Sequence, residues 1–252
     1  MVNSLMPRKL NRIEKKKRSI IRRFFSRFIN KSNSYIIQYL PDFIFEKNID
    51  FQLLRSSWIY DHVKNNDSDL VRLLFIIANV NQVIEEGVSG SIAELGVFKG
   101  NAAKVLSWLM SDRKIYLLDT YSGFSENDLT INEPTSSSKG DFNAGVDAVK
   151  SFVGGEDRIK YVQGYFPQTA NKIPSDEKFC FVNIDVDLYE PIKAGLEYFY
   201  PRMNLGGQII IHDYANSCWP GVKKAVDEFL INKTEKLIII PDKSGTATFR
   251  KL

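Results

Sequence analysis

The sequence has few of the features that would assign it to several large classes of protein. Only two cysteines, Cys180 and Cys218, occur in its 252 residues, and they form no CxxC or other metal-like spacing. We therefore expect reduced thiols and no disulfide framework. No apolar run reaches the ~18–20 residues of a membrane-spanning helix, and the N-terminus has no continuous apolar stretch typical of a secretory signal. These absences predict a cytoplasmic protein.

Glycine-rich phosphate loops are missing as well. The chain has no GxxxxGK[ST], and "AELGVFKG" departs from GxGxxG because Phe98 stands where a glycine would be required. RNP-like and zinc-finger patterns are also lacking, which argues against a nucleic-acid partner. What is present, 44% hydrophobic and 25% charged residues, is ordinary globular composition with enough apolar residues for a substantial core.

Charge is distributed unevenly along the chain. Residues 1–30 contain ten Lys or Arg and one acidic residue, a net +9, and because the whole chain carries +4, residues 31–252 carry −5. Isoleucines and phenylalanines recur between the arginines at helical spacing, which predicts a basic amphipathic helix. Such a helix suits peripheral contact with an anionic membrane, here its inner face. The alternatives are a solubilising arm and a helix that packs on the body or on a second subunit.

Hydrophobic periodicity divides the chain into a basic arm over 1–34, a helical segment over 35–90 and a core over 91–252. Five apolar strands alternate with helices in the core, and we expect them at 91–95, 114–119, 158–164, 178–185 and 207–213. This alternation predicts an α/β fold with a parallel sheet covered on both faces. The ending "KLIII", a turn and "TATFRK" predicts a hairpin, so that the last strand runs antiparallel to its neighbour.

Two local features complete this outline. The helix in "DSDLVRLLFIIANVNQVIEEGVSG" is expected to be capped by Asp67 or Ser68 and to end at Gly87 or Gly90. The segment 121–142 is rich in helix- and strand-breaking residues. Because long loops in compact domains are usually functional or disordered, we predict that it is a lid over a site.

Acidic residues stand at the carboxyl ends of the predicted strands, the edge where open parallel sheets bind ligands. Glu94 ends the first strand, and Gly96 permits a tight bend into a helix whose N-terminal amides favour an anionic group. Asp119 ends the second strand, where a carboxylate can accept hydrogen bonds from a ribose diol; the alternative is a turn-forming aspartate. Without phosphate-binding residues, this pattern favours a nucleoside cofactor that has no phosphates, and S-adenosylmethionine fits.

Two further strands end in "NIDVDLYE" and "QIIIHDYA", which contain Asp185, Asp187 and Asp213. Clustered carboxylates cost free energy unless a cation or hydrogen-bond donors meet them. Asp187 has a simpler role open to it, because it could cap the helix that begins near Tyr189, with Glu190 three residues on in a capping box. Tyr189 is expected to pack rather than react.

The segments "IAELGVFKGNAAKVL", "LLDTYSGF", "NIDVDLYEPIKAGLEYFYPRMNLGGQIIIHDY" and "PGVKKAVDEF" resemble the macrocin O-methyltransferase family over roughly residues 70–250. Members of this family are class I S-adenosylmethionine-dependent enzymes that methylate sugar hydroxyls with a bound Mg²⁺. The resemblance implies a Rossmann-like fold, with a seven-stranded, mostly parallel sheet and an antiparallel last strand, here preceded by a helical N-terminal extension. It also implies a sugar-containing acceptor and a homo-oligomer.

Carried over by position, the resemblance implies a set of site residues. The cofactor would be bound by Glu94, Leu95, Gly96, Gly100, Asn101, Asp119, Gly164 and Asp185. Asp185, His212 and Asp213 would hold the divalent metal, with Asp185 and His212 at the catalytic centre. Many relatives have two acids at 212–213, and imidazole suits Mn²⁺, Fe²⁺ or Zn²⁺ better than Mg²⁺. His212 is therefore a metal ligand, the general base, or a histidine hydrogen-bonded to the backbone beside the site.

Two other functions are open on the sequence. A glycosyltransferase could use the D-x-D of "DVD" to carry Mn²⁺ for a nucleotide sugar, although that would leave "AELGVFKG" and Asp119 unexplained. A non-catalytic adaptor could dock through its basic arm to a membrane or partner. Within the methyltransferase interpretation, the acceptor could be a sugar on a secondary metabolite or a saccharide in surface-polysaccharide assembly.

Overall fold

The computed structural model describes residues 40–58, 69–129 and 138–252, and the chain divides into two compact units, Met1–Ser56 and Ser57–Leu252. In the first unit the described elements are two short helices, α2 (Asp42–Glu46) and α3 (Phe51–Ser56). The basic arm predicted over residues 1–34 lies outside the described residues. Among the residues that are described, no helix is long and apolar enough to cross a bilayer.

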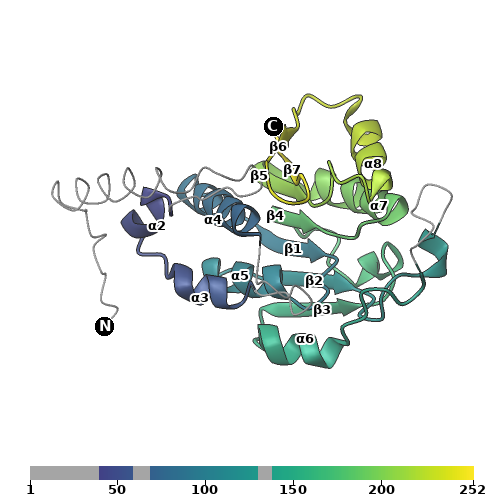
Figure 1. Ribbon diagram of the computed structural model, residues 1–252, viewed down its shortest axis with the longest axis horizontal. Helices are drawn as coiled ribbons and strands as arrows, with labels where there is room; N and C mark the ends of the chain where they lie inside the picture. Colours follow the sequence, from purple (N-terminus) through teal and green to yellow (C-terminus); the bar gives the residue numbers. More distant parts are fainter. Residues whose placement is uncertain (1–39, 59–68, 130–137) are drawn as a thin grey trace, which may run out of the picture. The chain divides into compact units, whose positions relative to one another are not determined.

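A seven-stranded sheet forms the centre of the second unit (Figure 1). Its strands are β1 (Ser91–Leu95), β2 (Ile115–Asp119), β3 (Ile159–Gln163), β4 (Phe179–Ile184), β5 (Met203–Ile211), β6 (Ile238–Ile239) and β7 (Ala247–Arg250). They lie in the order β3-β2-β1-β4-β5-β7-β6. The first five run parallel, and β7 runs antiparallel to both β5 and β6. This confirms the predicted fold class, including the terminal hairpin.

Helices cover both faces of the sheet. One face carries α4 (Leu70–Glu85), α5 (Asn101–Leu109) and α6 (Val146–Val153), and the other carries α7 (Tyr189–Phe199) and α8 (Pro220–Leu230), which pack on each other (Figure 1). Short 3₁₀ helices occur at η1 (Glu126–Asp128), η2 (Gln168–Lys172) and η3 (Tyr200–Arg202). Every residue of β1 and β4 is buried, as expected for parallel strands between two layers of helices.

The start of α4 differs from the sequence prediction. Its N-cap is Asp69, whose carboxylate accepts a hydrogen bond from the amide of Arg72 at 3.1 Å, so the predicted caps Asp67 and Ser68 were wrong. The segment "DSD" offers three capping side chains in a row, and spacing alone did not choose among them. The other Asp69 oxygen accepts the amide of Lys243 at 2.8 Å. Asp69 therefore ties the turn between β6 and β7 to the beginning of α4.

Candidate active site

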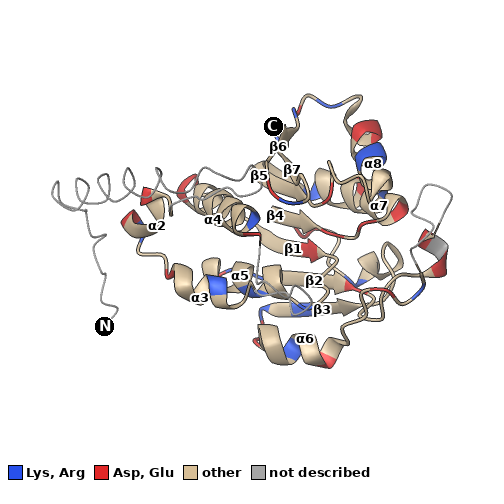
Figure 2. Cartoon of the chain, in the orientation of Figure 1, with Lys and Arg blue, Asp and Glu red and all other residues tan. Residues whose placement is uncertain are grey.

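Strand register brings the candidate residues to one edge of the sheet. Leu95 of β1 pairs with Ile184 of β4, and Ile184 pairs with Ile211 of β5. The ladder continues one residue further, because the amide of Asp185 donates to the carbonyl of Leu95 at 2.8 Å and the amide of His212 donates to the carbonyl of Ile184 at 3.0 Å. Parallel pairing thus holds Asp185 and His212 at the same level on neighbouring strands. Acidic residues mark this edge where β1 and β2 reach it (Figure 2).

A cavity of about 420 Å³ lies at this edge, within the range of small-molecule sites. Its lining includes seven of the eight residues implied to bind the cofactor: Glu94, Leu95, Gly96, Asn101, Asp119, Gly164 and Asp185. Gly100 does not belong to the lining. It is the N-cap of α5 with φ 85°, and a Cβ there would come within 2.5 Å of Val153. Close packing of α5 on α6 therefore explains this glycine without a ligand.

The turn after β1 is held by Asp119. One oxygen of its carboxylate accepts the amides of Val97 and Phe98 at 2.7 and 2.9 Å, and the other accepts the amide of Tyr121 at 2.7 Å. Gly96, with φ 86°, could not be replaced without strain, because a Cβ would lie 2.0 Å from the carbonyl oxygen of Asp185. Asp119 therefore forms turns, as expected of a turn-forming aspartate. It also lines the cavity, as a carboxylate that binds a ribose would have to.

Glu94 is buried, and among the described residues one of its two carboxyl oxygens has no hydrogen-bond partner. Its side chain is 2% exposed, and Oε1 accepts a hydrogen bond from Asn183 Nδ2 at 3.0 Å. Oε2 is buried and has no hydrogen-bond partner within the described part of the chain. Burial raises the pKa of Glu94 to about 8, so the carboxyl carries a proton at neutral pH. An unpartnered polar atom in the wall of a cavity is suited to a hydrogen bond with a bound molecule.

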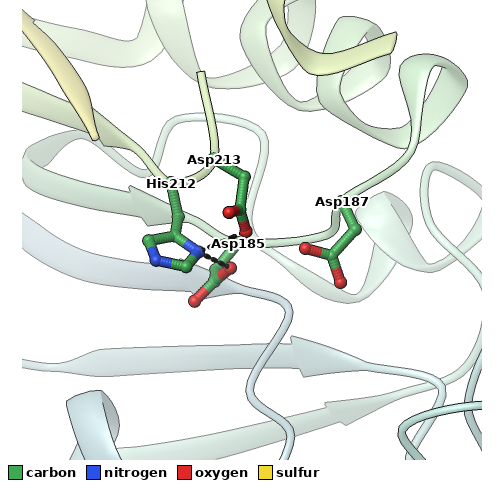
Figure 3. A group of neighbouring side chains, drawn as sticks. All are labelled: Asp185, Asp187, His212 and Asp213. Carbon is green, nitrogen blue, oxygen red and sulfur yellow. Dashed lines mark ion pairs between the residues drawn. The ribbon is translucent and has the colours of Figure 1, made fainter. Parts of the chain in front are cut away.

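Asp185, Asp187, His212 and Asp213 form a compact cluster in which one ligand atom of each lies within 4.8 Å of the others (Figure 3). His212 Nδ1 is 2.8 Å from Asp185 Oδ1 and 2.6 Å from Asp213 Oδ2. Neither contact is aligned as a hydrogen bond, so within the described residues Nδ1 has no hydrogen-bond partner. Carboxylate oxygens and an imidazole nitrogen that converge in this way fit a divalent first-row metal ion.

Sequence reasoning missed Arg72 altogether. This side chain is 4% exposed, and its guanidinium donates to Asp185 Oδ2 at 2.7 Å. It extends from α4, where it shares a helical face with the buried residues Ile76 and Val80. A charged residue on an apolar helix face was the available signal, but its partner lies 113 positions away in the sequence. The site therefore contains a fixed cation beside its carboxylates.

These cations set the protonation of the cluster. The partial burial of Asp185 opposes ionisation, but the charges of His212 and Arg72 outweigh it and hold the pKa of this carboxyl well below its usual range. Burial and Arg72 lower the pKa of His212, whereas the carboxylates of Asp185 and Asp213 raise it, with a net rise to about 9. Desolvation and the two neighbouring carboxylates raise the pKa of Asp187. With no metal bound, His212 is thus protonated at neutral pH, and the pKa of Asp187 lies above the pKa of Asp185.

Asp187 belongs to the cluster rather than to a helix cap. α7 begins at Tyr189 with Leu188 at the N-cap position, and no side chain caps it, so the predicted capping box of Asp187 and Glu190 was wrong. The chain turns at Asp187 with φ 60°, a strained conformation for a non-glycine residue. Tyr189 packs as expected, because it is buried and its hydroxyl donates to Glu228 at 2.6 Å.

Strained backbone concentrates around the cavity. Phe98, Phe142, Asp187 and Asp213 all have positive φ, between 48° and 63°, and all four line the cavity. Residues in this region cost of order 1–3 kcal/mol each and typically cluster at functional sites. The predicted lid, 121–142, contributes Phe124 and Phe142 to the lining, whereas residues 130–137 lie outside the described part of the chain. Its action as a lid stays a prediction.

Comparison with known proteins identifies the family that this chain resembles. The family model described as "Macrocin-O-methyltransferase (TylF)" matches residues 70–250. Mycinamicin III 3''-O-methyltransferase of Micromonospora griseorubida is 23% identical over 228 residues, covering 83% of this chain and 86% of that protein. A tetracenomycin-type rhamnosyl 4'-O-methyltransferase of Streptomyces olivaceus is 26% identical over 184 residues, covering 68% and 69%.

Solved structures share the fold. The O-methyltransferase NovP superposes with a TM-score of 0.61 at 23% identity, covering 72% of this chain and 79% of that chain. The calicheamicin methyltransferase CalS11 gives a TM-score of 0.56 at 19% identity, covering 97% and 95%. The chain therefore shares its fold with solved methyltransferase structures.

Proposed function

Because the chain belongs to the macrocin O-methyltransferase family, we propose that it transfers a methyl group from S-adenosylmethionine to a hydroxyl of a sugar or glycosylated acceptor, assisted by a divalent metal. The observation that carries this proposal is the convergence of Glu94, Asp119 and the Asp185–Asp213 cluster on one cavity. A glycosyltransferase would not need the turn after β1 or the unpartnered carboxyl of Glu94.

The cofactor, which supplies the methyl group as a sulfonium, would be bound by residues at the ends of β1 and β2. The first turn of α5 lines the cavity through Asn101 and Ala102, and amides at a helix N-terminus favour a carboxylate. Gly96 lets the backbone pass close to the end of β4. Glu94 offers a protonated carboxyl for a hydrogen bond. Asp119 fixes the turn and lines the cavity, where it would accept hydrogen bonds from the ribose.

The metal would be held by Asp185, His212 and Asp213, with Asp187 as a further donor. A divalent cation at this position supplies Lewis-acid character that lowers the pKa of an alcohol, as it does for bound water. Asp187 and His212 are the two candidates for accepting the hydroxyl proton.

Alignment of the two substrates would supply much of the rate enhancement. Holding two reactants in a reactive geometry is worth roughly 7–11 kcal/mol. Here the positioning groups stand on strand ends, and Arg72 and Asn216 fix the orientation of Asp185 and Asp213 through contacts of 2.7 and 2.5 Å. Rigid strand ends with fixed carboxylates suit such alignment.

The decisive test combines cofactor binding with methyl transfer. We expect isothermal titration to give micromolar binding of S-adenosylhomocysteine, and labelled S-adenosylmethionine to methylate a component of a cell extract only when divalent metal is present. Full turnover in EDTA-treated protein would reject the metal mechanism, and nucleotide-diphosphate binding without S-adenosylhomocysteine binding would favour a glycosyltransferase. Cofactor binding without any transfer would favour an adaptor. Mass spectrometry of glycans from cells with and without the protein would then identify the methylated hydroxyl.

The proposal also covers the location of the protein, its oligomeric state and the role of its basic arm. The protein acts in the cytoplasm, it forms a homo-oligomer, and its basic arm touches an anionic membrane surface near the assembly of surface glycans. Deleting residues 1–30 should reduce sedimentation with vesicles that contain anionic lipid. Unchanged sedimentation would contradict the role of the arm and leave the methyltransferase proposal intact.

A further inference from the structure

Four aromatic side chains line one part of the cavity and contact one another. The ring centroid of Phe142 lies 5.5 Å from Phe98, 5.2 Å from Phe124 and 6.2 Å from Trp219, and Phe124 lies 5.8 Å from Trp219. All the pairs are tilted or edge-to-face. The residues come from three separate loops: the turn after β1, the loop after β2 and the start of α8. We call Phe98, Phe124, Phe142 and Trp219 the aromatic wall.

The aromatic wall is exposed, unlike the aromatic residues of the core. Phe142 is 45% exposed and the other three are partly exposed, whereas Phe166, Phe179 and Phe199 contact one another at 5% exposure or less. Phe98 and Phe142 also keep positive φ values of 48° and 63°. A contiguous exposed apolar surface held in strained backbone, in a cavity, marks a surface that a ligand covers.

The charge of the cavity restricts what that ligand can be. Seven of the lining residues are aspartates, and three basic side chains, Arg72, Lys243 and His212, line the cavity with them. Arg72 and His212 already pair with Asp185. Besides the cluster, the carboxylates of Asp69, Asp128 and Asp141 line the cavity. Carboxylates accept hydrogen bonds from hydroxyls and amines but repel phosphates and other carboxylates.

We propose that the acceptor sugar carries no negative charge, and that the apolar face of its ring packs on the aromatic wall while its hydroxyl or amino groups donate to the carboxylates. This inference rests on the proposed function, because it assumes that the acceptor shares the cavity with the cofactor. Neutral and amine-bearing glycosides are accepted. Nucleotide-diphosphate sugars and glycosides of uronic acids are rejected by charge.

A panel of methyl glycosides tests the inference directly. In each ring configuration, the neutral hexoside, its amino-sugar analogue and its uronic acid are titrated into the full-length chain with S-adenosylhomocysteine and Mg²⁺, followed by saturation-transfer NMR and tryptophan fluorescence. UDP-glucose serves as the diphosphate probe. We expect the neutral or amino member to bind at least about tenfold more tightly than the uronic acid of the same configuration, since like charges in contact cost free energy. Equal or tighter binding of an anionic member would overturn the inference, as would binding of no glycoside.

Matched variants connect binding to the aromatic wall. Phe142→Ala should weaken glycoside binding about tenfold. Phe152→Ala, which removes an aromatic ring of similar exposure on α6 outside the cavity lining, should leave it unchanged. Trp219→Phe should abolish the fluorescence change and weaken glycoside binding, whereas Trp108→Phe, a change in α5 outside the cavity lining, should leave both the fluorescence change and binding intact. Equal effects of the Phe142 and Phe152 variants would contradict a role of the wall. Failure of S-adenosylhomocysteine to bind would instead refute the proposed function on which this inference depends.

Discussion

Each edge of the sheet holds one glutamate, and the two glutamates differ in their hydrogen-bond partners and in the direction of their pKa shifts. At the amino edge, Glu177 accepts hydrogen bonds from Ser91 Oγ at 2.7 Å and Tyr116 Oη at 2.5 Å, and Lys114 Nζ lies 3.6 Å away. Burial opposes ionisation of Glu177, but these donors outweigh it and lower its pKa. At the carboxyl edge, Glu94 keeps one oxygen without a partner among the described residues, and its pKa is raised to about 8.

This difference separates groups that stabilise the fold from groups that await a ligand. Partners satisfy the polar groups of the amino edge, where Arg113 also donates to the carbonyls of Val88 and Gly90. The carboxyl edge combines an unpartnered acid, strained backbone and clustered carboxylates, which a protein retains only where they serve a function. Changes at the carboxyl edge should therefore affect the reaction, and changes at the amino edge should affect stability.

The largest effect is expected from the cluster itself. Asp185→Ala or Asp213→Ala should lower methyl transfer by about a thousandfold or more, because each removes a metal donor and leaves His212 or Arg72 without its counter-charge. S-Adenosylhomocysteine binding should largely survive in Asp213→Ala. Transfer rates and isothermal titration measure the two properties separately.

Asp112→Ala is the control for this pair. Asp112 lies on the surface, 78% exposed, beside Arg113, so the variant should keep full activity. Equal losses in all three variants would indicate a general loss of structure. An active Asp185→Ala variant would remove the proposed metal mechanism.

Much of the fold was predictable from the sequence, because parallel strands buried on both faces are nearly continuous apolar runs. The first strand was predicted at its observed bounds, Ser91–Leu95. β5 begins at Met203, four residues before the expected start, because Gly206 and Gly207 interrupt the apolar pattern while the chain already pairs with β4 at Phe179. Breaker residues within a strand cannot be told from a loop by pattern alone.

The sequence predicted the site residues that stand at the ends of strands. It did not predict a residue whose place in the site depends on how a helix packs on the sheet. Asp185, His212 and Asp213 lie together because they follow adjacent parallel strands. Arg72 could not be assigned because its role depends on how α4 packs over β4. Asp187 was assigned to a helix cap because the sequence does not report a positive φ.

Replacement of Glu94 by Gln should remove a pH dependence of the free energy of unfolding. Its folded pKa, about 8, lies above the ordinary value of 4.5, so its contribution to stability is complete below 4.5 and is lost as pH rises through 8. A shift of one pKa unit corresponds to about 1.4 kcal/mol. The free energy of unfolding of the wild type should therefore fall by up to a few kcal/mol, relative to that of Glu94→Gln, between about pH 5 and pH 8. Urea unfolding at several pH values measures this difference. A constant difference would mean that Glu94 is already ionised or hydrogen-bonded, as Glu177 is.

His212→Asp should change which metal the carboxyl edge prefers. The substitution exchanges a nitrogen donor for an oxygen donor and adds negative charge, so the ratio of Mn²⁺ to Mg²⁺ affinity should fall by about tenfold or more. Isothermal titration with each ion gives this ratio without an activity assay. His212→Gln controls for loss of the imidazole. An unchanged ratio in His212→Asp would exclude His212 as a ligand and leave it as a base or a structural histidine.

The smallest effect is expected at the amino edge, where Glu177→Gln should cost stability and not activity. The Glu177 carboxylate accepts hydrogen bonds from Ser91 and Tyr116 in a partly buried site. A hydrogen bond to a charged group is worth roughly 1.5–3 kcal/mol, and a hydrogen bond to a neutral amide is worth less. We therefore expect the variant to lose about 1–2 kcal/mol of unfolding free energy at neutral pH. Because the folded pKa of Glu177 is lowered, its contribution is present above the ordinary value of 4.5 and disappears as pH falls through the folded pKa, opposite to Glu94. Tyr116→Phe in a double-mutant cycle would isolate the shared bond. Reduced transfer with unchanged unfolding would show that the amino edge also serves the reaction, and the division between the two edges would then be lost.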